Sequence, residues 1–286
     1  ATSFRSVAYG LTTSGATTYS YVAVGDAGAL SKSPAYTSTS ALAWTPVLTT
    51  GTTLDGVNLT GVLYALSKYI VVGAGGKVAH GTDISTWTAA TSGTTSDLNA
   101  IATNGSMVVA VGAGGTIIHS ADGTTWTAAT SVPTTENLNG VAYSTKGVWV
   151  AAGANGTLLS SADGSTWTTQ ASGTTASLKS VSAIASTTNS VTTYTIVAAG
   201  TNGTLLTSTD YGVTWTAQTL GTADLNAVFA STRFVAVGSG GAIYTSDDAI
   251  TWTPRTSPAS TSMYGLIHAN NIYTAVGAGS SSIYSY

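Results

Sequence analysis

Short apolar runs that end in glycine recur along the whole chain and set its pattern of hydrophobic and polar positions. Seven of these runs share a Val-Ala-Val-Gly-like phrase, and the intervals between their last glycines are 48, 39, 41, 47, 38 and 39 residues. These glycines are Gly25, Gly73, Gly112, Gly153, Gly200, Gly238 and Gly277. A period of about 40 residues predicts a repeat architecture, in which each unit is too small to bury a core alone and stacks on its neighbours.

Residues 98–137 show what one unit contains. Apolar and polar residues alternate over 98–102, as in a strand with one buried face, whereas 107–111 is almost wholly apolar, as in a strand buried on both faces. A third strand is expected at 116–119, and a fourth begins at Trp126. Asn-Gly, glycine-rich and Ser-Ala-Asp-Gly segments lie between them and favour tight turns. Each unit is therefore expected to form four short antiparallel strands.

Seven such units predict an all-β fold, a seven-bladed β-propeller that forms a single domain over residues 1–286. Helical repeats are excluded because no segment keeps a 3.6-residue period. Leucine-rich repeats have a shorter period and a leucine ladder, and the coils of a parallel β-helix are shorter still. An array of immunoglobulin-like domains is the remaining rival, but its units span about 100 residues. The expected blades are 4–53, 54–97, 98–137, 138–177, 178–224, 225–262 and 263–286.

The seventh blade is expected to have three strands instead of four. In blades two, three, four and six a tryptophan follows the last glycine of the run by 14 residues, and in blade five by 15. Counting 14 residues from Gly277 leads past Tyr286, so strands are expected only at 263–268, 271–276 and 282–286. An open sheet edge is a template for another chain, which makes the last strand a predicted partner edge, unless its fourth strand is simply dispensable. The residues of this edge are Ser282, Ile283, Tyr284, Ser285 and Tyr286.

Two units are longer than the others. Residues 11–20 of blade one and 186–194 of blade five are expected to lengthen the loop between the first and second strands. Surface loops carry variation and function, so we expect partner contacts on the face where these loops lie.

The turn between the third and fourth strands carries a motif. Its fullest copy is Ser208-Thr209-Asp210-Tyr211-Gly212-Val213-Thr214-Trp215, and shorter or weaker copies precede the tryptophans of four other blades. The motif resembles the Asp-box, and the chain resembles bacterial Asp-box (BNR-like) propellers, including photosystem II assembly-factor-like proteins and propeller lectins. The resemblance implies that the aspartate accepts backbone N–H bonds in the turn and that the tryptophan fills the gap between blades. The residues in these structural roles are Asp83, Asp122, Asp163, Asp210, Asp248, Trp87, Trp126, Trp167, Trp215 and Trp252.

The composition narrows the choice of partners. Charged residues make up 7% of the chain and the net charge is −3 with no basic cluster, so nucleic acid is not an expected partner. The absence of cysteine excludes disulfide bonds and thiolate metal sites. No apolar run reaches the roughly 18 residues that a membrane span needs. Low charge, abundant Thr and Ser, and a first residue other than methionine predict a secreted, extracellular bacterial protein whose signal peptide has been removed.

A polar residue follows the first apolar residue of the innermost strand in every blade. Inner strands line the channel of a propeller, so these seven side chains are expected to gather at the channel mouth. They form either a site for a small polar ligand or ion, or a hydrated rim that caps the strand ends. The residues are Arg5, Asp55, Asn99, Asn139, Lys179, Asn226 and Tyr264. Neither a metal site nor a cofactor is predicted.

An enzyme is not expected, because few groups suited to catalysis are present. Sialidase-type propellers with Asp-boxes need an arginine triad, an acid and a Tyr/Glu nucleophile pair, whereas this chain has three arginines and one glutamate. The sequence favours a non-catalytic extracellular interaction or structural scaffold, which assembles on a cell surface or filament through its open terminal blade. A protein partner or self-assembly is expected. The alternative is a glycan-binding lectin that uses Tyr9, Tyr64, Tyr143 or Tyr211 as an aromatic platform.

Overall fold

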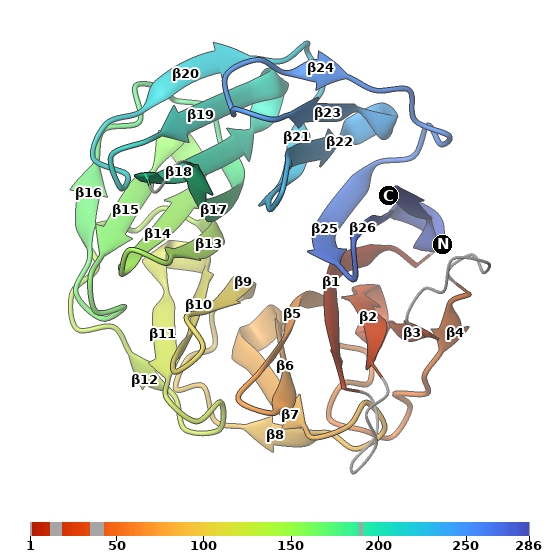
Figure 1. The fold of residues 1–286 in the computed structure, drawn as a ribbon. Helices are drawn as coiled ribbons and strands as arrows, with labels where there is room; N and C mark the ends of the chain where they lie inside the picture. Colours follow the sequence, from red (N-terminus) through yellow and green to blue (C-terminus); the bar gives the residue numbers. More distant parts are fainter. Residues whose placement is uncertain (1, 12–18, 35–42, 189–190, 286) are drawn as a thin grey trace.

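The computed structural model describes residues 2–11, 19–34, 43–188 and 191–285 and confirms the predicted fold class. The described residues form seven antiparallel sheets, each from strands that follow one another in the chain. The sheets stand in a ring around a central axis (Figure 1). Six sheets have four strands, and the last has three. The protein is therefore an all-β, seven-bladed propeller with a three-stranded last blade.

Each blade runs from an inner strand at the axis to an outer strand at the rim. Blade one consists of β1 (Phe4–Leu11), β2 (Tyr19–Gly25), β3 (Leu30–Pro34) and β4 (Thr45–Pro46). Blade two consists of β5 (Leu59–Ala65), β6 (Lys68–Gly73), β7 (Lys77–Gly81) and β8 (Thr88–Ala90). Blade three consists of β9 (Leu98–Thr103), β10 (Val108–Gly112), β11 (Ile117–Ser120) and β12 (Thr127–Ala128). Blades four and five consist of β13 (Leu138–Ser144), β14 (Val148–Gly153), β15 (Leu158–Ser161) and β16 (Thr168–Gln170); and β17 (Leu178–Thr188), β18 (Val191–Gly200), β19 (Thr204–Ser208) and β20 (Thr216–Thr219). Blades six and seven consist of β21 (Leu225–Ala230), β22 (Phe234–Gly238), β23 (Ile243–Ser246) and β24 (Thr253–Pro254); and β25 (Met263–Ala269), β26 (Ile272–Gly277) and β27 (Ser282–Ser285).

A single 3₁₀ turn joins the second and third strands of every blade. The turns are η1 (Asp26–Gly28), η2 (Ala74–Gly76), η3 (Ala113–Gly115), η4 (Ala154–Gly156), η5 (Thr201–Gly203), η6 (Ser239–Gly241) and η7 (Ala278–Ser280). The middle residue of each turn has a positive φ. It is glycine in blades two, three, six and seven and asparagine in blades four and five, the residues that adopt this conformation most readily, whereas blade one has Ala27. The glycine-rich segments of the sequence therefore mark these turns.

Blade two begins later than predicted. Its inner strand β5 starts at Leu59, which pairs with Gly73, and Leu54 lies in the loop before it. Leu54 is nevertheless completely buried, between blades one and two. A buried leucine followed by a polar residue imitates the start of an inner strand, which is why the predicted boundary at residue 54 is wrong.

The long segment of blade five is a strand pair rather than a loop. β17 continues to Thr188 and β18 begins at Val191, with Thr187 paired to Thr192. Threonine and valine are β-branched and favour extended backbone, so the added residues prolong the hairpin. The corresponding insertion of blade one falls mainly on residues 12–18, outside the described residues.

The core lies between the blades rather than within them. Seven apolar clusters each join residues of two adjacent blades. Between blades three and four, for example, Val109 and Val111 pack with Trp149, Leu159 and Trp167. The second strands are buried on both faces, as their apolar runs predict. Each blade therefore shares its core with two neighbours, and the burial of its apolar residues depends on both.

Blades one and seven close the ring through side chains. Tyr21 Oη donates to the carbonyl oxygen of Ala269 at 2.6 Å, and Trp44 Nε1 donates to Ser282 Oγ at 2.9 Å. The two ends of the chain lie close together at this junction (Figure 1). Within the described part of the chain, no helix has the length and apolar character needed to cross a membrane.

Candidate functional site

The inner strands enclose an axial channel with a volume of about 800 Å³. Six of the seven predicted rim residues line it, as the sequence predicts. They are Arg5, Asn99, Asn139, Lys179, Asn226 and Tyr264. The prediction for Asp55 is wrong, because this residue lies before β5, where its carboxylate accepts the N–H of Gly51 at 3.0 Å.

Thr60 takes the place in the rim that Asp55 was expected to fill. The spacing of the sequence contains the signal that identifies it. The first residue of the inner strand precedes the last glycine of the apolar run by 14 residues in blades three and seven, and Leu59 has the same spacing from Gly73. Leu54 lies 19 residues before that glycine.

Four of the uncharged rim side chains bind the next blade. Asn99 Nδ2 donates to the carbonyl oxygen of Leu138 at 2.8 Å, and Asn139 Nδ2 donates to that of Leu178 at 2.8 Å. Asn226 Nδ2 donates to Met263 at 3.0 Å, and Thr60 Oγ1 donates to Leu98. Each acceptor is the first residue of the neighbouring inner strand. These side chains therefore join adjacent blades, a role that the sequence pattern did not reveal.

The two cationic rim residues each form a salt bridge with an aspartate. Arg5 donates to both carboxylate oxygens of Asp26, at 2.8 and 3.1 Å, and lies 4.7 Å from the ring centroid of Tyr264. The hydrogen bond that Arg5 donates to Asp26 raises the pKa of Arg5 above its ordinary value, against the opposing effect of burial. Lys179 Nζ contacts Asp224 and Asn226, each at 2.9 Å. A charged ligand would have to compete with these pairs, so the rim favours water or a neutral guest.

The acidic residues near the rim accept hydrogen bonds from backbone N–H groups of the 3₁₀ turns. Asp97 Oδ1 accepts the N–H of Gly75 at 2.7 Å, and Asp224 Oδ1 accepts that of Asn202 at 3.0 Å. The hydrogen bond from Lys179 is the main cause that lowers the pKa of Asp224. Among the residues that the structure describes, no three His, Cys, Asp or Glu side chains gather closely enough to hold a metal ion.

The five predicted turn aspartates all accept backbone N–H groups. In the turn before Trp167, Asp163 Oδ1 accepts from Ser165 at 2.8 Å and from Thr166 at 2.7 Å. Trp167 Nε1 then donates to the carbonyl oxygen of Gly164 at 3.1 Å. The aspartates in equivalent turns are Asp83, Asp122, Asp210 and Asp248. The five tryptophans pack in the clusters between blades.

These turns make stability depend on pH. The N–H groups of Thr166 and Ser165 lower the pKa of Asp163 from its ordinary 3.8 to about 2. Because the pKa is lower in the folded protein than in the unfolded chain, the carboxylate stabilises the fold fully above about pH 4, and this contribution is lost as the pH falls through about 2. The aspartates with a lowered pKa are Asp83, Asp122, Asp163, Asp210, Asp224 and Asp248.

We expect Asp163→Asn to flatten the pH dependence without opening the turn, because an asparagine oxygen still accepts both N–H groups. The fall in Tm between pH 4 and pH 2 should be smaller than in the wild type, since one of the carboxylates with a lowered pKa no longer titrates. Thermal denaturation followed by circular dichroism across this range measures the effect. Identical curves for the variant and the wild type would contradict it.

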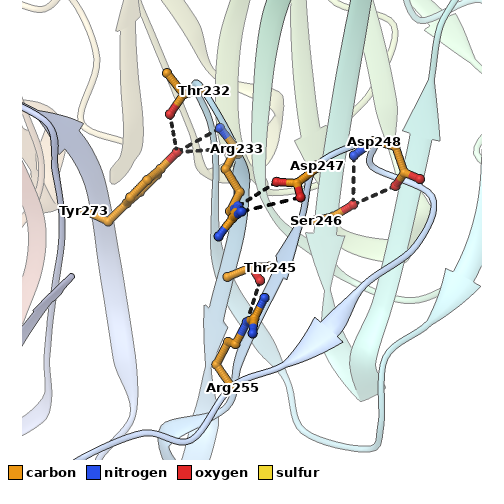
Figure 2. Close-up of polar contacts among 8 residues, drawn as sticks. All are labelled: Thr232, Arg233, Thr245, Ser246, Asp247, Asp248, Arg255 and Tyr273. Carbon is orange, nitrogen blue, oxygen red and sulfur yellow. Dashed lines mark hydrogen bonds and ion pairs between the residues drawn. The ribbon is translucent and has the colours of Figure 1, made fainter. Parts of the chain in front are cut away.

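A groove opens between blades six and seven and has a volume of about 440 Å³. We call it the six–seven groove. Its polar wall contains Arg233, which pairs with Asp247 at 2.6 Å, and Arg255, whose Nε donates to Thr245 Oγ1 at 2.8 Å (Figure 2). The apolar wall is formed by Val235, Val237, Ile243, Leu266, Tyr273, Ala275 and Ile283.

Tyr273 links the two blades that border this groove. Its hydroxyl donates to the carbonyl oxygen of Arg233 at 2.8 Å and accepts the N–H of the same residue at 3.0 Å (Figure 2). These hydrogen bonds join blade seven to the β21–β22 hairpin of blade six beside the groove.

The predicted partner edge forms the outer strand β27, which pairs with β26. Ser282, Ile283, Tyr284 and Ser285 belong to it, and Tyr286 lies outside the described residues. Ile283, Tyr284 and Ser285 also line the six–seven groove. The role of this edge in partner binding stays a prediction.

The four predicted aromatic platforms lie in two places. Tyr9, Tyr64 and Tyr143 line the channel. Tyr211 is 38% exposed and packs beside Tyr194, with 5.5 Å between ring centroids. Lys146 Nζ lies 5.7 Å from the ring of Tyr194 and 6.0 Å from that of Tyr211. Tyr194, Tyr211 and Lys146 thus form an aromatic patch with a cationic neighbour.

Comparison with known proteins agrees with this architecture. The DUF6242 beta propeller domain matches residues 83–229, slightly more than half of the chain. No curated protein matches the sequence. The solved structure of YCF48 bound to D1 peptide is similar with a TM-score of 0.73 at 14% identity, covering 99% of this chain and 91% of that chain.

Two further solved structures are similar over nearly the whole chain. YCF48 from Cyanidioschyzon merolae gives a TM-score of 0.71 at 16% identity, covering 100% of this chain and 96% of that chain. The WD40 beta propeller domain of Doa1 gives 0.74 at 10% identity, covering 99% and 93%. At these identities the likeness shows the propeller fold alone.

Proposed function

The chain belongs to the family of the DUF6242 beta propeller domain, and on that premise we propose that it is a non-catalytic extracellular scaffold. It assembles on a cell surface or filament through blade seven. The observation that carries this proposal is the six–seven groove, whose apolar wall lies beside the outer strand of the last blade. An apolar groove at the surface offers a partner area to bury.

Other observations support a protein partner. YCF48, which shares the fold, is bound to D1 peptide in its solved structure. The three arginines do not form the triad of a sialidase-type site, because Arg5 lines the channel whereas Arg233 and Arg255 line the six–seven groove. The Ser-x-Asp turns, with their serine, aspartate and tryptophan contacts, support kinship with Asp-box propellers. Secretion is supported by the low charge of 7% and by the absence of cysteine.

Site-specific cross-linking in the producing cells tests the scaffold. A photoreactive benzoylphenylalanine replaces Ile283 on blade seven in one variant and Thr127 on the fourth strand of blade three in a matched control. We expect adducts of defined mass from position 283, at least tenfold more abundant than from position 127. Equal or absent adducts at the two positions would contradict assembly through blade seven.

A glycan-binding lectin is the second candidate, and the patch of Tyr194, Tyr211 and Lys146 favours it. Aromatic faces stack on the apolar faces of sugars, and a nearby ammonium group donates hydrogen bonds to hydroxyls. A glycan array separates the two functions. Saturable glycan binding that Tyr211→Ala abolishes supports the lectin. The absence of binding to every glycan of the array supports the scaffold.

A further inference from the structure

The turn between the third and fourth strands of blade five contains one residue more than its counterpart in blade four. In blade four, Trp167 Nε1 donates to the carbonyl oxygen of Gly164 at 3.1 Å, and in blade five Trp215 Nε1 donates to that of Gly212 at 2.9 Å. The two glycines are therefore equivalent. Gly164 follows the aspartate of its turn directly, whereas Tyr211 stands between the aspartate and Gly212. Tyr211 is thus the extra residue of blade five.

The backbone of Tyr211 is strained, and its ring lies at the surface. Its φ is 66°, in the left-handed region that bulky residues rarely adopt. Strain of this kind costs stability and persists where function or packing requires the residue. The ring is 38% exposed, and Val213, which takes the place of Ser165 in blade four, is 62% exposed. The extra residue therefore brings aromatic and apolar area to the surface instead of burying it.

The prolonged hairpin of blade five supplies a second aromatic ring. Tyr194 precedes Gly200 by six residues, whereas the second strands of blades two, three, four, six and seven begin four or five residues before their last glycine. Tyr194 pairs with Ala185 in the added part of the hairpin. Its ring centroid lies 5.5 Å from that of Tyr211, with 52° between the ring planes. Two separate departures from the repeat thus meet at one place.

Lys146 of the β13–β14 hairpin adds a positive charge to these rings. Its Nζ lies 5.7 Å from the ring of Tyr194 and 6.0 Å from that of Tyr211. In blade two, by contrast, Lys68 Nζ donates to the carbonyl oxygen of Asp122, in the turn of the next blade, at 2.9 Å. Lys146 is exposed, and no carboxylate of the described residues lies within ion-pair distance of it. Its ammonium group can therefore pair with an anionic ligand.

Resting on the lectin that is the second candidate function, we propose that Tyr194, Tyr211 and Lys146 bind an acidic glycan through a uronic acid residue. The apolar face of the pyranose stacks on a tyrosine ring, and the carboxylate pairs with the Lys146 ammonium group. The size of the patch favours a saccharide over a protein, because a stable protein interface buries about 800 Å² on each partner. Three side chains and the adjacent Val213 offer far less than that.

Matched pairs of glycans test the role of the carboxylate. The acidic probes are trimers of galacturonic, mannuronic and guluronic acid and a hyaluronan tetrasaccharide, and each is compared with its methyl ester, which lacks the charge. Isothermal titration calorimetry with the whole protein measures the affinities. We expect saturable binding of at least one acid, at least fivefold tighter than that of its ester. This difference should fade at high salt, because the charged groups are exposed.

Protein variants locate the binding. Lys146→Met removes the charge and should weaken binding of the acid at least fivefold, while the affinity for the ester changes less than twofold. Tyr211→Gly should weaken binding of both glycans at least tenfold. Its urea midpoint should stay close to that of the wild type, because glycine adopts a positive φ without strain. Lys68→Met is the matched control and should bind as the wild type does.

Failure of this specificity differs from failure of the lectin. Equal affinity for acid and ester that still depends on Tyr211 would preserve the lectin and overturn the acidic ligand. Absence of binding to every probe would reject both and leave the scaffold. Two further results would overturn the proposal, namely equal binding by the Lys146→Met and Lys68→Met proteins, and binding of poly-glutamate as tight as that of the acidic glycans, which would identify an acidic peptide as the ligand.

Discussion

Replacing Gly115 by alanine is expected to destabilise the propeller by about 3–5 kcal/mol, whereas the same change at the adjacent Gly114 costs only about 1 kcal/mol. Both residues have a positive φ, 73° and 63°. A Cβ on Gly115 would lie 2.1 Å from the carbonyl oxygen of Thr134, while a Cβ on Gly114 would have no atom within 4 Å. Backbone strain is common to the two variants, and the steric clash is confined to one.

The clash arises from the architecture of the blade. The third residue of the 3₁₀ turn is glycine in six blades, and a Cβ there would lie between 1.9 and 2.5 Å from a carbonyl oxygen in the segment that leads to the next blade. These residues are Gly28, Gly76, Gly115, Gly156, Gly203 and Gly241. Blade seven has Ser280 at this position with a φ of 60°, and its hydroxyl donates to the carbonyl oxygen of Thr2 at 3.2 Å. Close approach of the connecting segment therefore explains the glycine.

Urea denaturation followed by tryptophan fluorescence measures both glycine variants. The difference between Gly115→Ala and Gly114→Ala isolates the steric part, because the lost backbone freedom and the left-handed conformation affect both. Ser280→Ala tests the same position in blade seven, which already carries a Cβ, and should change stability by less than about 1 kcal/mol. Equal destabilisation by Gly115→Ala and Gly114→Ala would show that the turn conformation alone requires glycine.

Periodicity made the blade count and the strand order predictable from the sequence. Apolar runs such as Val109–Val111 identify strands buried on both faces, and the three strands expected over residues 263–286 are those of the last blade. The pattern of apolar and polar residues failed to locate the start of a strand where a buried leucine lies outside the strand. Leu54 is as buried as Leu59, yet it precedes the strand, so Asp55 was assigned to the rim in error.

The roles of the candidate residues were harder to predict, because they depend on contacts between blades. The position of Asn99 beside the channel follows from the repeat, but its acceptor, the carbonyl oxygen of Leu138, lies 39 residues away and belongs to backbone. No side-chain pattern in the sequence reports such a bond. Likewise, the sequence does not report that Arg255 donates a hydrogen bond to Thr245 beside the six–seven groove.

Replacing Trp167 by alanine is expected to cost about 3–5 kcal/mol, as for other large-to-small changes in cores. Trp167 is 2% exposed and packs with Val109, Val111 and Leu159 between blades three and four. The variant would leave a cavity between blades three and four, and both blades pack against the cluster that this cavity would open. Urea denaturation gives the magnitude, and a change below about 1 kcal/mol would contradict the role of tryptophan as the filler between blades.

A matched pair of phenylalanine variants separates packing from hydrogen bonding. Trp167 Nε1 donates to Gly164 at 3.1 Å, whereas Trp126 Nε1 is buried without an acceptor among the described residues. Trp167→Phe therefore loses both volume and a hydrogen bond, and Trp126→Phe loses volume while removing an unsatisfied donor. We expect Trp167→Phe to be the more destabilising of the two by about 1 kcal/mol. The opposite order in urea denaturation would mean that packing, not the turn hydrogen bond, distinguishes these tryptophans.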